Sequence, residues 1–255
     1  MHELARAHCP ELLAQATAAL GADPFERAED GTAHLQPAVY CGTLAHWRAA
    51  GEPLADFAVG HSLGELAALT AAGCLSPAEG MRLVLARGRA MQHAADAGAP
   101  GGLLAVIGSR SLALELRERH ELTLAADNEP DQIVLSGPLE RLQAARAQAP
   151  SAGLKTTRLR VPAALHSSAM AAAVAPFRRA LEQTAFAPAR MTVIANVTAA
   201  PFADCTAELA LALTSCVRWR ESILTLHAGG VSSYREMGTH GILTGLVERT
   251  LAGRA

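Results

Sequence analysis

The stretch LADFAVGHSLGELAALTAAG, residues 54–73, decides the fold. Residues 54–60 are a short apolar run that ends in glycine, which is typical of a buried strand. Residues 63–72 are rich in alanine and leucine and predict a helix that ends at Gly73. The chain therefore passes from strand to helix through Gly60-His-Ser-Leu-Gly64, a G-x-S-x-G motif in the setting where that motif presents a serine nucleophile.

The chemistry of this turn centres on Ser62. A serine at a sharp strand-to-helix turn has a strained backbone, which small glycines on both sides permit. Its hydroxyl stands clear of the sheet, and the amide of Leu63 points to the same place from the positive end of the helix dipole. Such an amide stabilises an oxyanion by about 3 kcal/mol. We therefore expect Ser62 to act as a nucleophile with Leu63 beside it.

A serine nucleophile needs a base, and the chain has ten histidines. His61 lies in the motif, but the geometry of the turn is expected to point it away from the serine. His166 lies in a loop between a predicted strand and a predicted helix, where an inserted segment rejoins the main domain, which is a natural position for a cleft. His240, in Gly238-Thr-His-Gly241, is the late alternative.

The inserted segment, residues 101–162, is predicted to have the order β-α-β-β-α-β, a ferredoxin-like arrangement. Its expected strands are 103–107, 122–125, 132–135 and 154–161, and its expected helices are 112–119 and 139–149. Because the two ends of such a unit lie close together, it can be inserted into a larger domain.

The remaining chain alternates helices and strands, which predicts a parallel sheet covered on both faces. The expected helices are 3–20, with Pro10 as a break or first-turn residue, 37–49, 76–94, 167–184, 207–215, 219–228 and 243–251, and the expected strands are 54–60, 191–197 and 231–237. The predicted fold class is α/β: an α/β-hydrolase-like large subdomain with a parallel sheet (1–100 and 163–255) and an inserted ferredoxin-like small subdomain (101–162).

Composition narrows the function classes. The 255 residues carry 22 Lys and Arg against 24 Asp and Glu, with no basic run that would favour nucleic acid. The apolar stretches are too short to span a membrane, and residues 1–21 lack the features of a signal peptide. The five cysteines include no C-x-x-C pair and are expected to be reduced. We expect a cytoplasmic protein without a metal site.

Further motifs lie in order along the chain. They are Gln36-Pro-Ala38, Arg87-Gly88 with Met91-Gln92, Asn128-Glu-Pro130 with Ser136-Gly137, His166-Ser-Ser-Ala-Met170, Asn196-Val-Thr198, Val217-Arg-Trp219, and Glu236-Met-Gly238 with Leu243-Thr-Gly-Leu246. Together with the serine motif, they resemble the malonyl-CoA:acyl-carrier-protein transacylase family, which includes the acyltransferase domains of fatty-acid and polyketide synthases. The resemblance runs from about Gln36 to near the end of the chain.

The resemblance implies a role for each matching position. Ser62 would carry the acyl group, His166 would be its base and then the acid for the departing thiol, and Leu63 would donate its amide to the oxyanion. Arg87 would bind the free carboxylate of a malonyl group, because a planar guanidinium matches a carboxylate with two parallel hydrogen bonds. In this family backbone carbonyls hold the histidine, so no acidic partner is expected.

The resemblance also places His61, Gln36 and Asn128 in the substrate-binding set. The implied partners are malonyl-CoA and an acyl carrier protein, with no cofactor beyond the coenzyme A thioester that is the substrate. The implied reaction is transfer of malonyl through an acyl-serine intermediate, in fatty-acid or polyketide synthesis.

Two departures from the family pattern stand out. The glycine-rich F-P-G-Q-G segment, whose glutamine helps to form the oxyanion site, has no counterpart in this sequence. Either that segment lies upstream or the oxyanion site lacks one donor, a loss of roughly 10²–10³-fold in rate. Before the histidine, Ala163-Ala-Leu-His166 stands where malonyl-selective polyketide domains usually read H-A-F-H and methylmalonyl-selective ones Y-A-S-H, so acyl selectivity stays open.

Two other functions stay open at this point. A serine esterase or thioesterase of the α/β-hydrolase type would use the same turn with His240 as its base, although no HGGG-type loop accompanies it. A degenerate, non-catalytic module would only dock a carrier protein.

Overall fold

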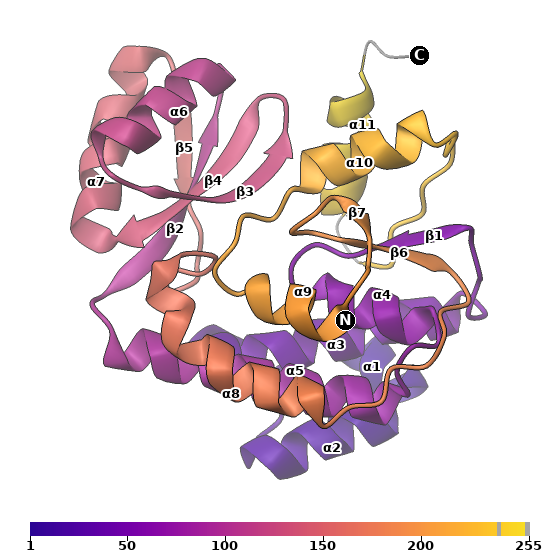
Figure 1. The fold of residues 1–255 in the computed structure, drawn as a ribbon. Helices are drawn as coiled ribbons and strands as arrows, with labels where there is room; N and C mark the ends of the chain where they lie inside the picture. Colours follow the sequence, from indigo (N-terminus) through magenta and orange to yellow (C-terminus); the bar gives the residue numbers. More distant parts are fainter. Residues whose placement is uncertain (239–240, 253–255) are drawn as a thin grey trace.

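The computed structural model describes residues 1–238 and 241–252, in which two sheets are flanked by helices (Figure 1). The first sheet has the strand order β1-β6-β7, with β1 (Phe57–Val59) parallel to β6 (Thr192–Ala195) and β6 antiparallel to β7 (Ala200–Pro201). The helices around it are α1 (His2–His8), α2 (Pro10–Leu20), α3 (Thr32–Ala49), α4 (Gly64–Ala71), α5 (Pro77–Ala97), α8 (Ala171–Glu182), α9 (Cys205–Leu211), α10 (Trp219–Ala228) and α11 (Ile242–Leu251). None of the described helices is long and apolar enough to cross a membrane.

The second sheet is formed by a continuous part of the chain. In order, its elements are β2 (Gly101–Ile107), α6 (Arg110–Arg119), β3 (Thr123–Glu129), β4 (Gln132–Pro138), α7 (Leu139–Gln148), the 3₁₀ turn η2 (Ala149–Ala152) and β5 (Lys155–Arg158). The strands lie in the order β3-β4-β2-β5, and all neighbours are antiparallel. This is the predicted β-α-β-β-α-β order, and the α/β fold class is confirmed. The boundaries of the two subdomains stay a prediction.

Separate apolar cores support the two sheets. One core lies among α3, α4, α5 and α8 and includes Leu44, Leu66 and Phe177. Another lies between the second sheet and its two helices and includes Leu135 and Leu142. A third core joins the sheets, because Ile194 of β6 and Trp219 of α10 belong to the same cluster as residues of β2, β3 and β4.

Helix α3 begins earlier than the sequence predicts. The expected start was Pro37, but the helix starts at Thr32 and Pro37 lies inside it. A proline inside a helix removes one backbone hydrogen bond, so the first turn needs other support. The side chain of Gln36 donates to Thr32 Oγ1 over 2.7 Å, and α3 packs closely on α5, where a Cβ at Gly88 would meet Ala33 at 3.2 Å.

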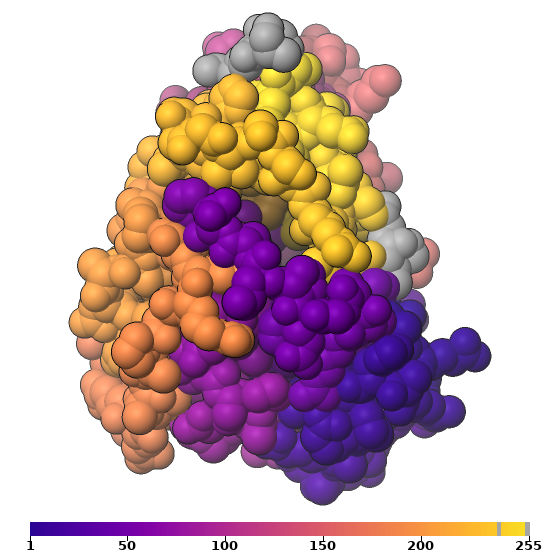
Figure 2. All heavy atoms as spheres, turned by 90° about the vertical axis from the view of Figure 1, so that its right-hand side faces the viewer, coloured from indigo at the N-terminus to yellow at the C-terminus, as the bar shows by residue number. Residues whose placement is uncertain are grey.

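The predicted strand at residues 231–237 is wrong, because this segment is irregular. Within the described residues, β1 pairs on one side only, with β6, so its other edge lies free beside a cavity. The cavity has a volume of about 1290 Å³, is lined by β1, α4, α10 and residues 229–237, and reaches Gly60, His61 and Gly64. Figure 2 shows the hollow between the purple and yellow parts of the surface. The segment has the composition of a strand, but it lies across the cavity from the free edge of β1 and pairs with no strand of the described residues.

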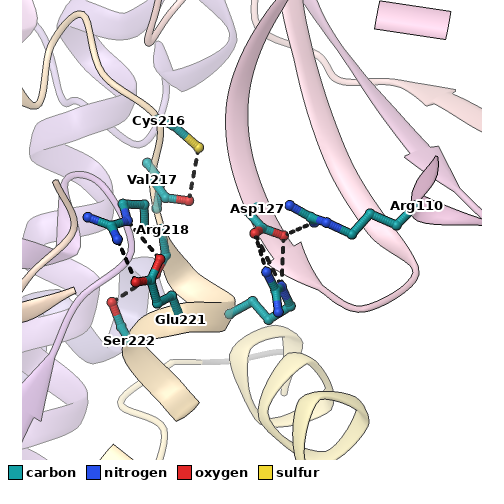
Figure 3. A network of polar contacts seen from close by, with 8 residues as sticks. Arg110, Asp127, Cys216, Val217, Arg218, Glu221 and Ser222 are labelled. Atoms are coloured by element: carbon teal, nitrogen blue, oxygen red, sulfur yellow. Dashed lines mark hydrogen bonds and ion pairs between the residues drawn. The ribbon is translucent and has the colours of Figure 1, made fainter. Parts of the chain in front are cut away.

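Polar contacts join the second sheet to α10 and α11. Asp127 on β3 accepts hydrogen bonds from Arg110 of α6 and from Arg220 Nη2, the latter over 3.0 Å (Figure 3). The Asp127 amide donates to the Val217 carbonyl over 2.9 Å, and Glu129 pairs with Arg249 of α11. These contacts fix the end of β3 against the part of the molecule that carries the serine turn.

Candidate functional site

The serine turn has the geometry that the sequence predicts. Ser62 lies between β1 and α4 with a φ of +53°, in the left-handed region that costs a non-glycine residue about 1–2 kcal/mol. Gly60 must be glycine, because a Cβ there would lie 1.9 Å from the Gly64 carbonyl carbon. A Cβ at Gly64, in contrast, would meet no heavy atom within 4 Å. The close approach at Gly60 and the strained angle at Ser62 therefore make the turn, and Gly64 is not needed for space.

The hydroxyl of Ser62 lies between an imidazole and a guanidinium. Its Oγ is 2.7 Å from His166 Nε2 and accepts a hydrogen bond from Arg87 Nη2 over 3.1 Å. His166 comes from the loop before η3 (Ser168–Met170) and Arg87 from the middle of α5, so three distant parts of the chain meet at one oxygen atom. This arrangement can transfer the hydroxyl proton to the imidazole while the oxygen attacks a carbonyl.

The tautomer of His166 follows from its other contacts. Nδ1 lies 2.9 Å from the Ala212 carbonyl and 3.2 Å from the Ser215 carbonyl. Carbonyl oxygens only accept, so Nδ1 carries the proton and Nε2 is free to accept from Ser62. Burial and then the positive charge of Arg87 lower the pKa of His166 to about 3. The imidazole is therefore neutral at physiological pH, and Nε2 is the nitrogen that can accept a proton.

Arg87 is buried without an acidic partner. Its Nη1 donates to Gln36 Oε1 over 2.7 Å, and no carboxylate of the described residues lies within 4 Å of its guanidinium. Burial lowers the pKa of Arg87 to about 10, against the opposing effect of Glu65. A buried cation with no counter-ion attracts an anionic group, and the fork of a guanidinium suits a carboxylate.

The amide of Leu63 points to the same region from the start of α4. It makes no hydrogen bond within the described residues, whereas the neighbouring Ser62 amide is occupied by Asn196 Oδ1 over 2.7 Å. A free amide at a helix start can donate to a developing oxyanion.

His61 and Asn128 form a separate pair beside this group. His61 Nε2 lies 2.9 Å from Asn128 Oδ1, and the Asn128 amide donates to Gln132 Oε1 over 2.9 Å. The His61 ring also lies against Trp219, with centroids 5.5 Å apart. Hydrogen bonds thus link Ser62, His166, Arg87 and Gln36, while His61 and Asn128 bridge the two sheets next to them.

The sequence analysis missed Glu65 and Asn196 as parts of this site. Asn196 was noticed only as part of a motif, and Glu65 only as a residue of the helix after the serine motif, because a glutamate in the first turn of a helix usually faces solvent. Here both are buried, and Asn196 binds the backbone on both sides of the turn. The one signal in the sequence was the position of Glu65, three residues after the serine in a helix that is otherwise apolar.

Three further expectations concern His240, a metal site and the cysteines. His240, the alternative base, lies outside the described residues. The described residues hold no cluster of three or more His, Cys, Asp or Glu that could bind a metal ion. All five cysteines are free thiols.

Comparisons with known proteins agree on one family. Residues 18–254 match the family described as acyl transferase domain. The chain is 36% identical over 234 residues to "Polyketide biosynthesis protein PksE" of Bacillus subtilis, covering 86% of this chain and 29% of that protein. It is 35% identical over 201 residues to "Malonyl CoA-acyl carrier protein transacylase" of Synechocystis sp., covering 76% of this chain and 66% of that protein.

The fold has close counterparts among solved structures. The crystal structure of malonyl CoA-acyl carrier protein transacylase from Burkholderia pseudomallei superposes with a TM-score of 0.88 at 31% identity, covering 98% of this chain and 92% of that one. The chain thus spans less than two thirds of PksE and of the Synechocystis protein, but most of the Burkholderia structure.

Proposed function

Because the chain belongs to the acyl transferase domain family, we propose that it moves a malonyl group from coenzyme A to the phosphopantetheine thiol of an acyl carrier protein. The observation that carries this proposal is the single oxygen, Ser62 Oγ, held 2.7 Å from His166 Nε2 and 3.1 Å from Arg87 Nη2. The names of the relatives support the choice of malonyl and carrier protein.

In the first half-reaction Ser62 Oγ attacks the thioester carbonyl and its proton passes to His166 Nε2. The carbon–sulfur bond then breaks, and the coenzyme A thiolate takes the proton from His166 as it leaves. The amide of Leu63 donates to the oxyanion that forms between these steps, an interaction of about 3 kcal/mol. The product is a malonyl ester on Ser62.

In the second half-reaction the carrier thiol gives its proton to His166 and attacks the ester carbonyl. The bond from carbon to Ser62 Oγ breaks, and His166 returns the proton to that oxygen. Because Nδ1 of His166 is held by the Ala212 and Ser215 carbonyls, the ring keeps the same orientation in both directions.

Arg87 selects the acyl group in this scheme. Its guanidinium binds the free carboxylate of malonyl, and Gln36 aims it through the hydrogen bond to Nη1. His61 and Asn128 contribute to the substrate-binding wall between the two sheets. The coenzyme A thioester is the substrate, and the scheme requires no other cofactor. The location proposed for the chain is the cytoplasm.

The test is the intact mass of the protein after incubation with malonyl-CoA alone. We expect a single malonyl adduct on the wild-type chain, its loss on adding a carrier protein that bears phosphopantetheine, and no adduct on Ser62→Ala. An adduct that persists in Ser62→Ala would refute the proposed intermediate. Absence of any adduct on folded wild-type protein would favour a non-catalytic docking module, and steady ester hydrolysis without a thiol acceptor would favour an esterase.

A further inference from the structure

A single side chain, Asn196, holds the backbone on both sides of Ser62. It follows β6 directly and is only 1% exposed. Its Oδ1 accepts from the Ser62 amide over 2.7 Å, and its Nδ2 donates to the Gly60 carbonyl over 2.8 Å. The primary amide thus spans the turn from residue 60 to residue 62 and replaces the hydrogen bonds that a neighbouring strand would supply.

Glu65 in turn holds Asn196. The carboxyl group is 2% exposed, and its Oε1 accepts from the backbone amide of Asn196 over 2.7 Å. The backbone amide of Glu65 donates to the Ser62 carbonyl over 3.1 Å, and the Asn196 carbonyl accepts from the Arg218 amide over 3.1 Å. The hydrogen bonds therefore form a closed ring: Ser62 to Asn196, Asn196 to Glu65, and Glu65 back to Ser62.

The carboxyl group of Glu65 acts in this ring as an acceptor and not as a counter-ion. Burial raises the pKa of Glu65 to about 8, although the hydrogen bond from Asn196 and the charge of Arg87 oppose the shift. A pKa of about 8 favours the uncharged acid at neutral pH, and no salt bridge within 4 Å joins Glu65 to Arg87 among the described residues. A glutamine at this position would keep the acceptor oxygen.

We propose that Glu65 and Asn196 are positioning residues that hold Ser62 in its strained conformation for acyl transfer. This inference deepens the proposed function and rests on Ser62 as the nucleophile. The ring also decides which amide serves the oxyanion, because the Ser62 amide is occupied by Asn196 while the Leu63 amide is free. Loss of the ring lets the turn relax, and misplacement of a reacting group by about 1 Å costs on the order of 10²-fold in rate.

The test measures the rate of acylation per folded molecule in a single turnover with malonyl-CoA. Asn196→Ala and Glu65→Ala are expected to slow acylation about 10²-fold, with KM for malonyl-CoA within about threefold of the wild-type value. Glu65→Gln is expected to restore the rate to within about threefold, because its amide oxygen can accept from Asn196. The double variant is expected to be no slower than the slower single one, since both changes break the same ring.

Thr70→Val provides the matched control. Thr70 lies on the same helix, α4, and its hydroxyl bonds the buried Tyr40 hydroxyl and the Leu66 carbonyl, each over 2.8 Å, but no atom of the ring. The control loses a buried hydrogen bond and some stability but is expected to acylate at the wild-type rate. If Asn196→Ala and Glu65→Ala acylate as fast per folded molecule as Thr70→Val, the ring is merely structural and the proposal fails.

Two further measurements keep the proposal testable if a variant does not fold or the substrate is another one. Asn196→Asp keeps the acceptor for the Ser62 amide but sets an oxygen against the Gly60 carbonyl, so it is expected to slow acylation as well. Phenylmethylsulfonyl fluoride tests the ring without malonyl-CoA: a bond forms from Ser62 Oγ to sulfur, and fluoride leaves with the proton. If wild-type protein is sulfonylated but not malonylated, the proposed substrate is wrong and the proposed role of the ring is not affected. Equal sulfonylation rates in wild type and Asn196→Asp would contradict the proposal that the ring positions Ser62.

Discussion

The two sheets of this molecule are supported in different ways. The second sheet has four antiparallel strands, and its central pair is in unbroken register from Gly101 paired with Pro138 to Ile107 paired with Gln132. The first has three short strands, and β1 pairs along only three residues. Yet the short sheet carries Ser62, and the well-paired sheet contributes only Asn128 to the site.

The difference shows that, around Ser62, buried side-chain hydrogen bonds give the support that strand pairing gives in the second sheet. The side chain of Asn196 bonds two neighbours and that of Gln36 bonds three, and Glu65 supports Asn196. A buried polar side chain that lacks a hydrogen-bond partner lowers the stability of the fold, so each of these side chains holds its neighbour firmly in place. We therefore expect changes near Ser62 to alter rates and changes in the second sheet to alter stability.

The largest expected effect in rate is that of His166→Ala. Removal of the base should slow acylation by malonyl-CoA about 10³-fold, within the range found for general bases. The measurement is single-turnover release of coenzyme A. His46→Ala is the control, because His46 lies on α3 and bonds only the Gly42 carbonyl, over 2.8 Å. A rate within tenfold of wild type would exclude His166 as the base.

The largest expected effect on stability comes from the second sheet. Leu135 is fully buried on β4, and Leu135→Ala should lower the free energy of unfolding by about 2–5 kcal/mol. Acylation per folded molecule should not change. Denaturant unfolding and single-turnover rates check the two statements.

Leu66→Ala is the counterpart of this change in the first region. Leu66 is equally buried, but it lies in the first turns of α4, close to Ser62. This variant should lose both stability and rate. If both variants kept their rates, or both lost them, the two sheets would not differ as described.

The sequence predicted most of the fold because most elements carry their own signals. Ser76 shows this at the start of α5, the predicted start of the helix, where its side chain accepts from the Glu79 amide as an N-cap. The pairs of strands in the second sheet likewise follow from apolar runs and turns. Residues 231–237 failed because the formation of a strand depends on a neighbour, which no local pattern encodes.

For the site, the sequence predicted residues that the structure brings together at Ser62 Oγ, but not the residues that support them. Ser62 stood out by its motif, and the His166 and Arg87 motifs by family resemblance. Asn196 and Glu65 gave no comparable signal, because their roles depend on contacts between residues more than 130 positions apart, as the separation of 131 between Asn196 and Glu65 shows. Contacts across such separations come only from the folded chain.

Arg87→Ala tests the origin of acyl selectivity. Loss of the guanidinium should lower kcat/KM for malonyl-CoA about 10²-fold while affecting acetyl-CoA much less, since acetyl has no free carboxylate. Arg82→Ala, on the same helix and bonded to Thr184, is the control. Competition between the two thioesters, read from the mass of the acyl-enzyme, gives the ratio directly. An unchanged ratio would assign selectivity to other residues.

The smallest expected effect is a pH dependence of stability that comes from Glu65. Its pKa is about 8 in the folded chain, mainly because of burial, and about 4.3 when unfolded. The folded state therefore binds the extra proton between these values, so the stabilisation is complete below about pH 4 and is lost as pH rises toward 8.

The side chain introduced by Glu65→Gln does not titrate. The difference in free energy of unfolding between wild type and Glu65→Gln should therefore shift against the wild type, by on the order of 1 kcal/mol or more, between about pH 5 and pH 8. Denaturant titrations at both pH values measure this difference. A constant difference would mean that Glu65 is ionised in the folded chain, and the carboxyl group near Ser62 would then be a counter-ion for Arg87.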